Sequence, residues 1–240
     1  MEGPDIDTVP RGKRNRLLAA LPDSDLRRID PCLLEVSPPL GEVIYEAGEN
    51  IKSLFFPTTA TVSMLYVLES GGTTEVALIG REGVVGVPLF LGDPTSTTRA
   101  VILCAGGLLQ MPADFAMEEF KRGGALQHLL LRFTKVLFTQ VAQTAVANRH
   151  YTLRQQLCRW LLLSLDRCDG NELKMTQQLI AEMLGVRREG VTEAARELQD
   201  LGMIRYRRGH ITVVDRPAME RCAGECYTIV KTDYAQSLPT

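Results

Sequence analysis

Five charged side chains fall within ten residues of this chain, at Arg187, Arg188, Glu189, Glu193 and Arg196. An arginine can donate two hydrogen bonds to O6 and N7 of guanine, and a glutamate can accept one from N4 of cytosine. Each such contact discriminates between bases by roughly 1 to 3 kcal/mol. The chemistry therefore predicts that Arg188 and Glu189 read base edges in duplex DNA.

Polar and basic residues on either side fit contacts to the DNA backbone. Thr176 and Gln177 precede the charged segment, and Arg207 and Arg208 follow it. Phosphate contacts position a protein on the duplex without specifying sequence, and this is the role predicted for these four residues. Thr192 can reach a base or a phosphate.

Glu193 is the residue of this group that needs a special account. A carboxylate beside a polyanion lowers affinity. Glu193 must therefore accept a hydrogen bond from a cytosine amino group, or form an ion pair with Arg188 or Arg196.

Residues 175–204 must position these side chains, and they have the pattern of a helix-turn-helix. Thr176 can cap a first helix by accepting a hydrogen bond from its first turn. Gly185 tolerates the left-handed conformation of a sharp turn, and a second helix is predicted over roughly residues 187–201. The predicted apolar face of that helix consists of Val191, Ala194, Ala195 and Leu198. An ordinary amphipathic helical hairpin is the alternative.

Two short β-prone runs follow within residues 203–214, joined by a basic Arg-Arg-Gly turn at residues 207–209. This is the pattern of a wing. The net charge of −2 argues at first against a nucleic-acid partner, but residues 148–216 carry 12 Lys and Arg against 9 Asp and Glu, a net charge of +3. A solvated basic face is the alternative to a phosphate-binding one.

The rest of the chain divides into a β-rich part and a helical part. From residue 32 to about 111, Val-, Ile-, Phe- and Tyr-rich runs alternate with Gly and Pro turns, which predicts an antiparallel roll without exposed edges. Helices are predicted over residues 113–122, 125–148 and 217–234. The helix at 125–148 is apolar on more than one face, which favours packing against its own roll and against the same helix of a second subunit. Burial within one chain is the alternative.

The predicted fold class is therefore α+β, with an N-terminal antiparallel, jelly-roll-like β roll, a long dimerisation helix and a C-terminal winged helix-turn-helix. The predicted boundaries are 1–20 for a tail and short helix, 21–123 for the roll as a sensor domain, 124–148 for the dimerisation helix and 149–240 for the winged domain.

Targeting, metal and redox signals are weak. Residues 1–11 are predicted to be a disordered tail without a signal-peptide core, and no window is apolar enough to span a membrane. Six cysteines without a framework spacing suit reduced thiols in a cytoplasm. Cys222 and Cys226 hold at most half of a zinc site, so no metal or cofactor is predicted. A redox role for Cys104 lacks a visible partner.

The order of roll, long helix and winged domain, with GEVIYEAGE at residues 41–49, resembles the Crp/Fnr superfamily of bacterial transcription regulators. The resemblance covers about residues 15–235. It implies a homodimer in which an effector on the roll resets the long helices and the spacing of two DNA-reading heads. The implied partners are double-stranded DNA, a second copy, RNA polymerase and a small-molecule effector. Glu193 stands where the family commonly has a guanine-reading arginine, which puts the family's usual half-site in question.

The effector site departs from the resemblance. Cyclic-nucleotide binders of the superfamily carry Gly-Glu-Leu, followed about ten residues later by Arg-Ser or Arg-Thr. Here Val87 follows Gly86, and a valine side chain cannot accept a hydrogen bond from a ribose hydroxyl. An unpaired hydroxyl in the bound state is unfavourable by roughly 1 to 3 kcal/mol, which predicts no tight binding of cyclic AMP. Thr97, Thr98 and Arg99 remain, with Gly86, the candidate residues for another effector.

Other function classes have less support in the sequence. Only Cys32 lies in the first hundred residues, which argues against an N-terminal iron-sulfur cluster, and His128 is the only candidate haem ligand. The three histidines lie in different segments, so no catalytic site can be assembled and no enzyme is predicted. A cyclic-nucleotide-binding signalling module whose winged domain contacts protein is the alternative to a DNA-binding regulator.

Overall fold

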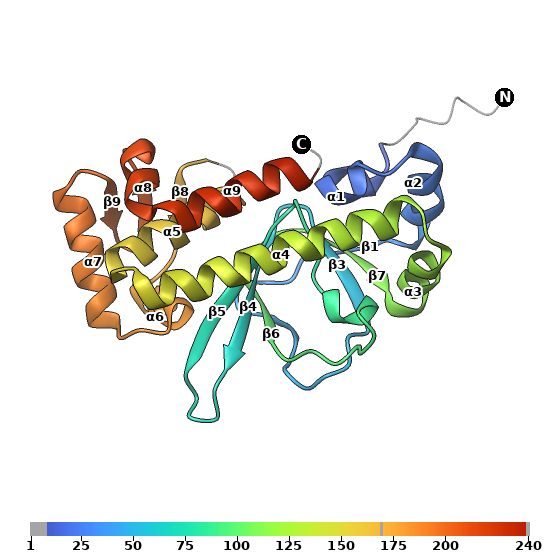
Figure 1. Cartoon of the computed structure of the whole chain (residues 1–240), viewed down its shortest axis with the longest axis horizontal. Coiled ribbons are helices and arrows are strands. Elements are labelled where there is room, and N and C mark those ends of the chain that lie inside the picture. The colour runs from blue at the N-terminus through green and yellow to red at the C-terminus, as the bar shows by residue number, and fades with distance from the viewer. Residues whose placement is uncertain (1–8, 169, 239–240) are drawn as a thin grey trace.

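The computed structural model describes residues 9–168 and 170–238. At the N-terminal end of the chain, short helices pack against a β roll (Figure 1). These helices are η1 (Arg11–Arg14), α1 (Arg16–Ala19), α2 (Asp23–Ile29) and η2 (Asp30–Cys32). Asn15 fixes them to the roll, because its Oδ1 accepts a hydrogen bond from Leu18 N (3.1 Å) and its amide donates to two backbone carbonyls of the roll at 2.9 and 3.0 Å. A disordered tail was predicted over residues 1–11. Residues 1–8 lie outside the described residues, and helix η1 begins at Arg11.

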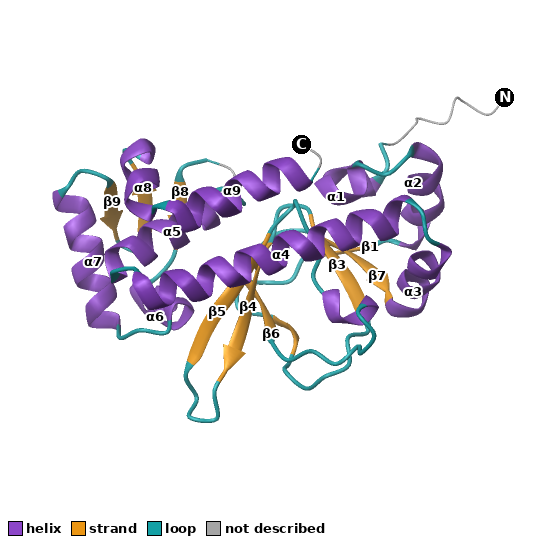
Figure 2. Ribbon diagram, in the orientation of Figure 1, coloured by secondary structure: helices purple, strands orange, loops and turns teal. Residues whose placement is uncertain are grey.

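The roll consists of two antiparallel sheets, as the sequence predicted (Figure 2). One sheet has the order β1-β7-β3 and the other has the order β2-β6-β4-β5. Apolar side chains of both sheets, such as Phe56, Ile79 and Ile102, are fully buried in one core. The strands are β1 (Leu34–Val36), β2 (Val43–Tyr45), β3 (Ser53–Pro57), β4 (Thr61–Val67), β5 (Thr73–Ile79), β6 (Arg99–Cys104) and β7 (Leu108–Pro112), with η3 (Val87–Phe90) before β6.

Two helices follow the roll, α3 (Ala113–Arg122) and the long α4 (Ala125–His150), which runs along the molecule (Figure 1). The side chains of Leu130, Phe133 and Val136 on α4 are buried in the core of the roll. Phe138 is 75% exposed, so one apolar face of α4 stays uncovered within the chain. Among the described residues, no helix is long and apolar enough to cross a bilayer.

The C-terminal part is a winged helical domain around a second core. A three-stranded sheet of order β8-β10-β9 lies beside its helices. The elements are α5 (Leu153–Leu165), β8 (Glu172–Lys174), α6 (Gln177–Leu184), α7 (Arg188–Asp200), β9 (Ile204–Arg207), β10 (His210–Val213), α8 (Arg216–Ala223) and α9 (Glu225–Ser237).

The prediction of one final helix over residues 217–234 is wrong. The chain breaks at Gly224, where φ is 65°, a conformation that favours glycine. The hydroxyl of Tyr151 fills the space beside Gly224 and accepts a hydrogen bond from Cys226 N (3.2 Å). After the break, α9 runs back beside α4, where Asp233 forms an ion pair with Lys135 (Figure 1). Alpha-helical periodicity continues through this glycine, so the pattern alone did not reveal the reversal.

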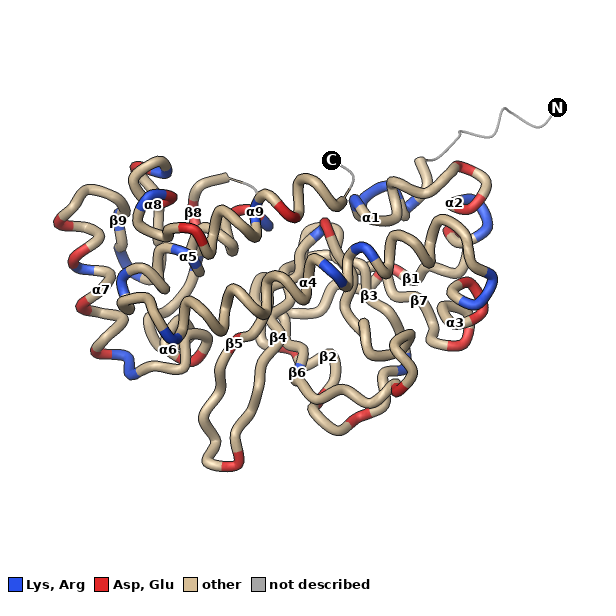
Figure 3. The backbone as a smooth tube through the Cα atoms, in the orientation of Figure 1, with Lys and Arg blue, Asp and Glu red and all other residues tan. Residues whose placement is uncertain are grey.

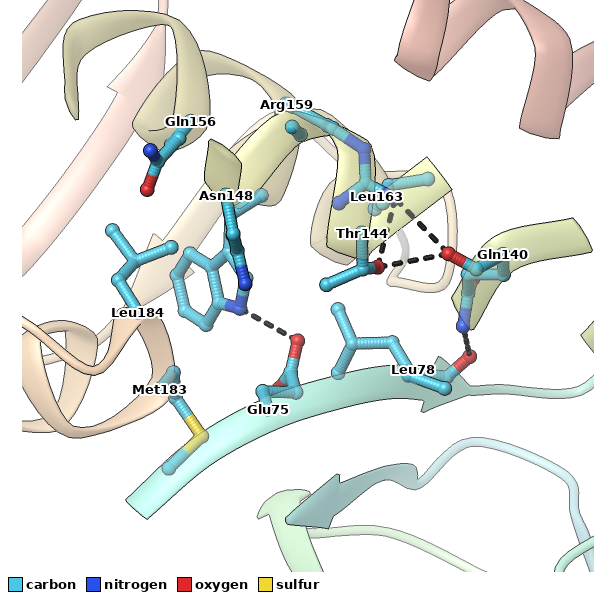
Figure 4. A pocket seen from close by; sticks show the side chains of 13 residues that line it. Glu75, Leu78, Gln140, Thr144, Asn148, Gln156, Arg159, Leu163, Met183 and Leu184 are labelled. Carbon is cyan, nitrogen blue, oxygen red and sulfur yellow. Dashed lines mark hydrogen bonds between the residues drawn. The ribbon is translucent and has the colours of Figure 1, made fainter. Parts of the chain in front are cut away.

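The winged domain is docked on the roll through a buried polar contact. Glu75 of β5 accepts hydrogen bonds from Trp160 Nε1 (2.8 Å) and Ser63 Oγ (2.6 Å), as Figure 4 shows for the indole. Leu65, Leu78 and Leu103 of the roll pack in the core of the winged domain. The roll and the winged domain therefore share a buried interface.

Candidate nucleic-acid interface

The first helix of the motif begins and ends as its sequence predicts. Thr176 is the N-cap of α6, and its side chain accepts a hydrogen bond from Leu179 N (3.1 Å). Gly185 ends the helix at φ 66°, in the left-handed region. The sharp turn that this conformation allows brings α7 across α6, and the two helices pack against each other.

The second helix, α7, separates an apolar face from a charged one. Val191, Ala194, Ala195 and Leu198 are buried, as predicted from their spacing. The charged and polar residues of the opposite face are all exposed, and these are Arg187, Arg188, Glu189, Thr192, Glu193 and Arg196. The helix thus presents to solvent the side chains that the sequence assigned to DNA.

The wing is a hairpin with a tight two-residue turn. Arg207 pairs with His210 in the register of β9 and β10, so Arg208 and Gly209 form the turn. Both turn residues have positive φ, 52° and 81°, which is the requirement of a type I′ turn. Arg207 and Arg208 are exposed at this tip, and Met175 N donates to Gly209 O (2.7 Å), which ties the wing to the start of α6.

Three segments far apart in the sequence converge on one open hollow of about 540 Å³. The start of α6 contributes Thr176 and Gln177, the start of α7 contributes Arg188, and the wing contributes Arg208. Thr192 Oγ1 donates to Gln177 Oε1 (2.8 Å), which links the two helices beside the hollow. Of the ten residues predicted to contact DNA, these four therefore lie on one surface, and Thr192 lies next to them.

The hollow also has lining residues that sequence analysis missed, namely Gln178, Tyr206 and Gly209. Tyr206 is held in place because its hydroxyl donates to Met175 O (3.1 Å) and its backbone N–H donates to Gln199 Oε1 (2.8 Å). Burial raises the pKa of the Tyr206 hydroxyl, so this side chain stays neutral beside Arg188. Its position in a strand between two exposed arginines was the available signal.

Both positive and negative side chains lie along α7 (Figure 3). Arg196 pairs with Asp200 at 4.0 Å, and not with Glu193 as one alternative had it. Within the described residues, neither Glu193 nor Arg188 forms an ion pair, which leaves the first two turns of the helix free for another molecule. Of the two alternatives for Glu193, the ion pair within the protein is therefore not formed among the described residues, and Arg196 instead pairs with Asp200 one turn farther along the helix.

The residues predicted for an effector do not form an open anion site. Arg99 forms an ion pair with Glu46 (Nε–Oε2 2.7 Å), so its guanidinium is already neutralised. Thr98 and Gly86 are buried, whereas Thr97 is exposed. Val87, in the place of the expected glutamate, packs in the core of the roll. Thr98 and Arg99 are adjacent in sequence, and no contact between these candidate residues, all of which the structure describes, makes them a shared site.

Comparisons with known proteins agree with this architecture. Residues 35–122 match the family model of the cyclic nucleotide-binding domain, and residues 155–222 match that of the Crp-like helix-turn-helix domain. A putative Crp/Fnr-family transcriptional regulator from Eubacterium rectale has the same fold, with a TM-score of 0.70 at 18% identity over 89% of this chain and 100% of that one. The chain belongs to the Crp/Fnr superfamily.

Two relatives of this Crp/Fnr protein are named as global nitrogen regulators. The global nitrogen regulator of Nostoc sp. is 27% identical over 183 residues, 72% of this chain and 81% of the relative. The global nitrogen regulator of Synechococcus elongatus is 25% identical over 192 residues, 75% of this chain and 86% of the relative. The structure of FixK2 from Bradyrhizobium japonicum shares the fold, with a TM-score of 0.69 at 17% identity over 80% of this chain and 98% of that one. With both domain models matched, the protein is a transcription regulator of the Crp/Fnr type.

Proposed function

We propose that the protein is a sequence-specific DNA-binding regulator that acts as a homodimer and reads a pseudo-palindromic operator through the start of α7. The observation that carries this proposal is the convergence of Thr176, Gln177, Arg188 and Arg208 on one open surface. A base-reading helix flanked by two backbone-contacting segments is the arrangement of a winged helix-turn-helix on duplex DNA.

The residues of this surface divide by reach and chemistry. Arg188 and Glu189 lie in the first turn of α7, and the N-terminal residues of a recognition helix are those that reach base edges in the major groove. Arg187, Arg207 and Arg208 supply positive charge for phosphates on either side of the groove. Glu193 is unpaired and lies one turn farther along α7. A hydrogen bond from a cytosine amino group would offset the repulsion between its carboxylate and the DNA.

A second copy of the chain is the partner that the uncovered face of α4 fits. Leu131, Phe138 and Val146 are exposed on this helix at steps of seven and eight residues, which places them on one side. Ala142 and Ala145 are exposed on the same helix, and small residues let two helices approach closely. Pairing of α4 with its symmetry mate removes this apolar stripe from water.

Phe138→Glu is expected to separate the subunits, because it places two carboxylates at the centre of the apolar stripe. Phe138 is 75% exposed within the chain, so the fold of each subunit should change little. Sedimentation equilibrium should shift from dimer to monomer, and operator binding should fall at least tenfold. Leu40→Glu, at a residue that is 56% exposed on the roll, is the matched control and should stay dimeric. A dimeric Phe138→Glu protein would contradict this interface.

We further propose that residues 21–123 act as a sensor, 124–148 as the dimerisation helix and 149–240 as the DNA-binding domain. Docking of Trp160 on Glu75 supports communication between the sensor and the head. An effector of the roll must either displace Glu46 from Arg99 or use another part of the roll, because Arg99 is already paired. Cyclic AMP does not fit the site because Val87 is buried and offers no acceptor.

Selection of tight-binding fragments from randomised duplex DNA tests the proposed function directly. We expect the purified dimer to enrich an inverted repeat with half-site centres about 34 to 36 Å apart, or a multiple of that distance. A protein carrying Arg188→Ala, selected in parallel, should lose preference at one position in each half-site. Enrichment of no motif, with or without added nucleotides, would favour a winged domain that contacts protein.

A further inference from the structure

Two cysteine thiols from different domains lie side by side at the junction of roll and head. Cys104 is the last residue of β6, and Cys168 follows the end of α5 by three residues. Their Sγ atoms are 3.8 Å apart, although 64 positions separate them in sequence. The structure thus supplies the partner that the sequence did not reveal for Cys104.

These two thiols are accessible and lie at the junction between the two domains. Cys104 and Cys168 are each partly exposed, whereas Cys158 and Cys226 are buried. Thr61 Oγ1 lies 3.9 Å from Cys168 Sγ, so a hydroxyl of β4 adjoins the pair. The hydrogen bond with Cys168, followed by burial, raises the pKa of the Cys104 thiol.

We propose that Cys104 and Cys168 form a reversible disulfide that fastens the DNA-reading head to the β roll. A disulfide needs its sulfur atoms about 2.05 Å apart, and the two sulfurs already stand in contact at 3.8 Å. One bond at this place joins β6 of the sensor to the segment after α5 of the head. It adds a covalent link to the domain interface that the Glu75–Trp160 contact and the apolar side chains of the roll already form.

The oxidant is a low-molecular-weight disulfide such as glutathione disulfide. The thiolate of one protein cysteine attacks a sulfur of glutathione disulfide, which forms a mixed disulfide and releases one glutathione thiolate. The second protein thiol loses its proton and attacks the protein sulfur of the mixed disulfide, which releases the second glutathione. The two protein thiols are oxidised, one glutathione disulfide is reduced to two thiols, and a dithiol reductant reverses both steps.

The regulatory consequence rests on the proposed function. Two heads of a dimer must match the spacing of two half-sites, and each head must be free to adjust relative to its roll. A covalent link at the junction removes this freedom in both subunits. The redox state of Cys104 and Cys168 therefore sets the affinity for DNA.

Trypsin provides a direct assay, because Cys104 and Cys168 fall in separate peptides, residues 100–121 and 168–174. The full-length reduced protein is incubated with glutathione disulfide, its free thiols are alkylated, and the unreduced digest is analysed by mass spectrometry. We expect a linked pair of these two peptides within one chain, which disappears after treatment with dithiothreitol. In Cys104→Ser, Cys168 should instead remain as a mixed disulfide with glutathione. Cys32→Ser is the matched control, because Cys32 is also partly exposed and should leave the link intact.

DNA binding then tests the consequence with the same samples. The oxidised and reduced proteins should differ at least fivefold in affinity for the selected operator, and this difference should be absent in Cys168→Ser. Recovery of both cysteines in unlinked, alkylated peptides would overturn the proposed disulfide, and so would a link between two chains. Equal affinities of the linked and reduced proteins would overturn its regulatory role. Failure of the reduced protein to bind any DNA would count against the proposed function alone, because the peptide link is measured without DNA.

Discussion

Arg188→Ala should weaken operator binding roughly 5- to 150-fold for each half-site, because a bidentate arginine–guanine contact contributes about 1 to 3 kcal/mol. Arg188 is exposed at the start of α7 and forms no ion pair within the described residues. Its removal therefore breaks no contact that stabilises the fold, and the thermal unfolding temperature should stay unchanged. Competition binding with a set of single-base variants of the operator measures the effect.

The decisive feature of this result is its dependence on sequence. The wild-type protein should discriminate strongly at one base pair of each half-site, whereas Arg188→Ala should bind all four variants at that position with similar affinity. At the other positions, both proteins should have the same preferences. Loss of preference at one position identifies a base reader, because a phosphate contact carries no sequence information.

Arg207→Ala is the matched control, since Arg207 is also an exposed arginine and lies in the wing beside Arg208. It should weaken all sequences alike and lower the salt dependence of binding by about one for each subunit. If Arg188→Ala left both affinity and base preference unchanged, the proposed docking of α7 in the major groove would be wrong. If instead both variants lost affinity uniformly, Arg188 would contact phosphate, and Glu189 would remain the candidate base reader.

Local features of the head could be predicted because they depend on neighbouring residues. Thr176 caps α6 through an N–H three residues away, and Gly185 permits a turn within the motif. The burial of Val191 and Ala194 follows from helical spacing. Each of these predictions needs only an interaction over a few residues, so the pattern of side chains was sufficient.

Contacts between distant segments could not be predicted in the same way. Glu75 and Trp160 are 85 positions apart in sequence, with β6, β7 and the whole of α4 between them, and neither residue belongs to a recognisable motif. Cys104 and Cys168 meet only because the head docks on the roll. The direction of α9 depends on Gly224 and Tyr151, whose proximity results from the packing of the whole domain. Such contacts are set by tertiary packing, which helical or strand periodicity does not encode.

Glu75→Gln should make the protein more stable above pH 7 and remove most of its pH dependence near neutrality. Burial raises the pKa of the Glu75 carboxyl from 4.5 to about 7, while the hydrogen bonds from Ser63 and Trp160 act in the opposite direction. Between these two pH values, the folded protein holds a proton that the unfolded chain has lost. The contribution of this proton to the free energy of unfolding should therefore be complete below about pH 4.5 and should be lost as the pH rises through 7.

The expected size of the effect follows from the shift in the pKa. A rise from 4.5 to about 7 corresponds to roughly 3 kcal/mol between the two ends of the range. A glutamine keeps the shape of the side chain, accepts from Trp160 with its carbonyl and donates to Ser63 with its amide, so no buried group loses a partner. Urea unfolding at several pH values should show that the free energy of unfolding of the variant increases relative to that of the wild type as the pH rises. Glu118→Gln, at an exposed carboxylate, should follow the wild type.

Trp160 offers a local readout of the same proton, because it is the only tryptophan in the chain. Its indole donates to Glu75 at 2.8 Å, so ionisation of the carboxyl changes the charge beside the fluorophore. We expect the emission of the folded wild type to titrate with a midpoint near pH 7, and the emission of Glu75→Gln to stay constant. A titration that persists in the variant would assign the proton to another group. A titration that is lost would place an ionisable carboxyl at the interface between roll and head, where its charge opposes docking because the side chain is buried.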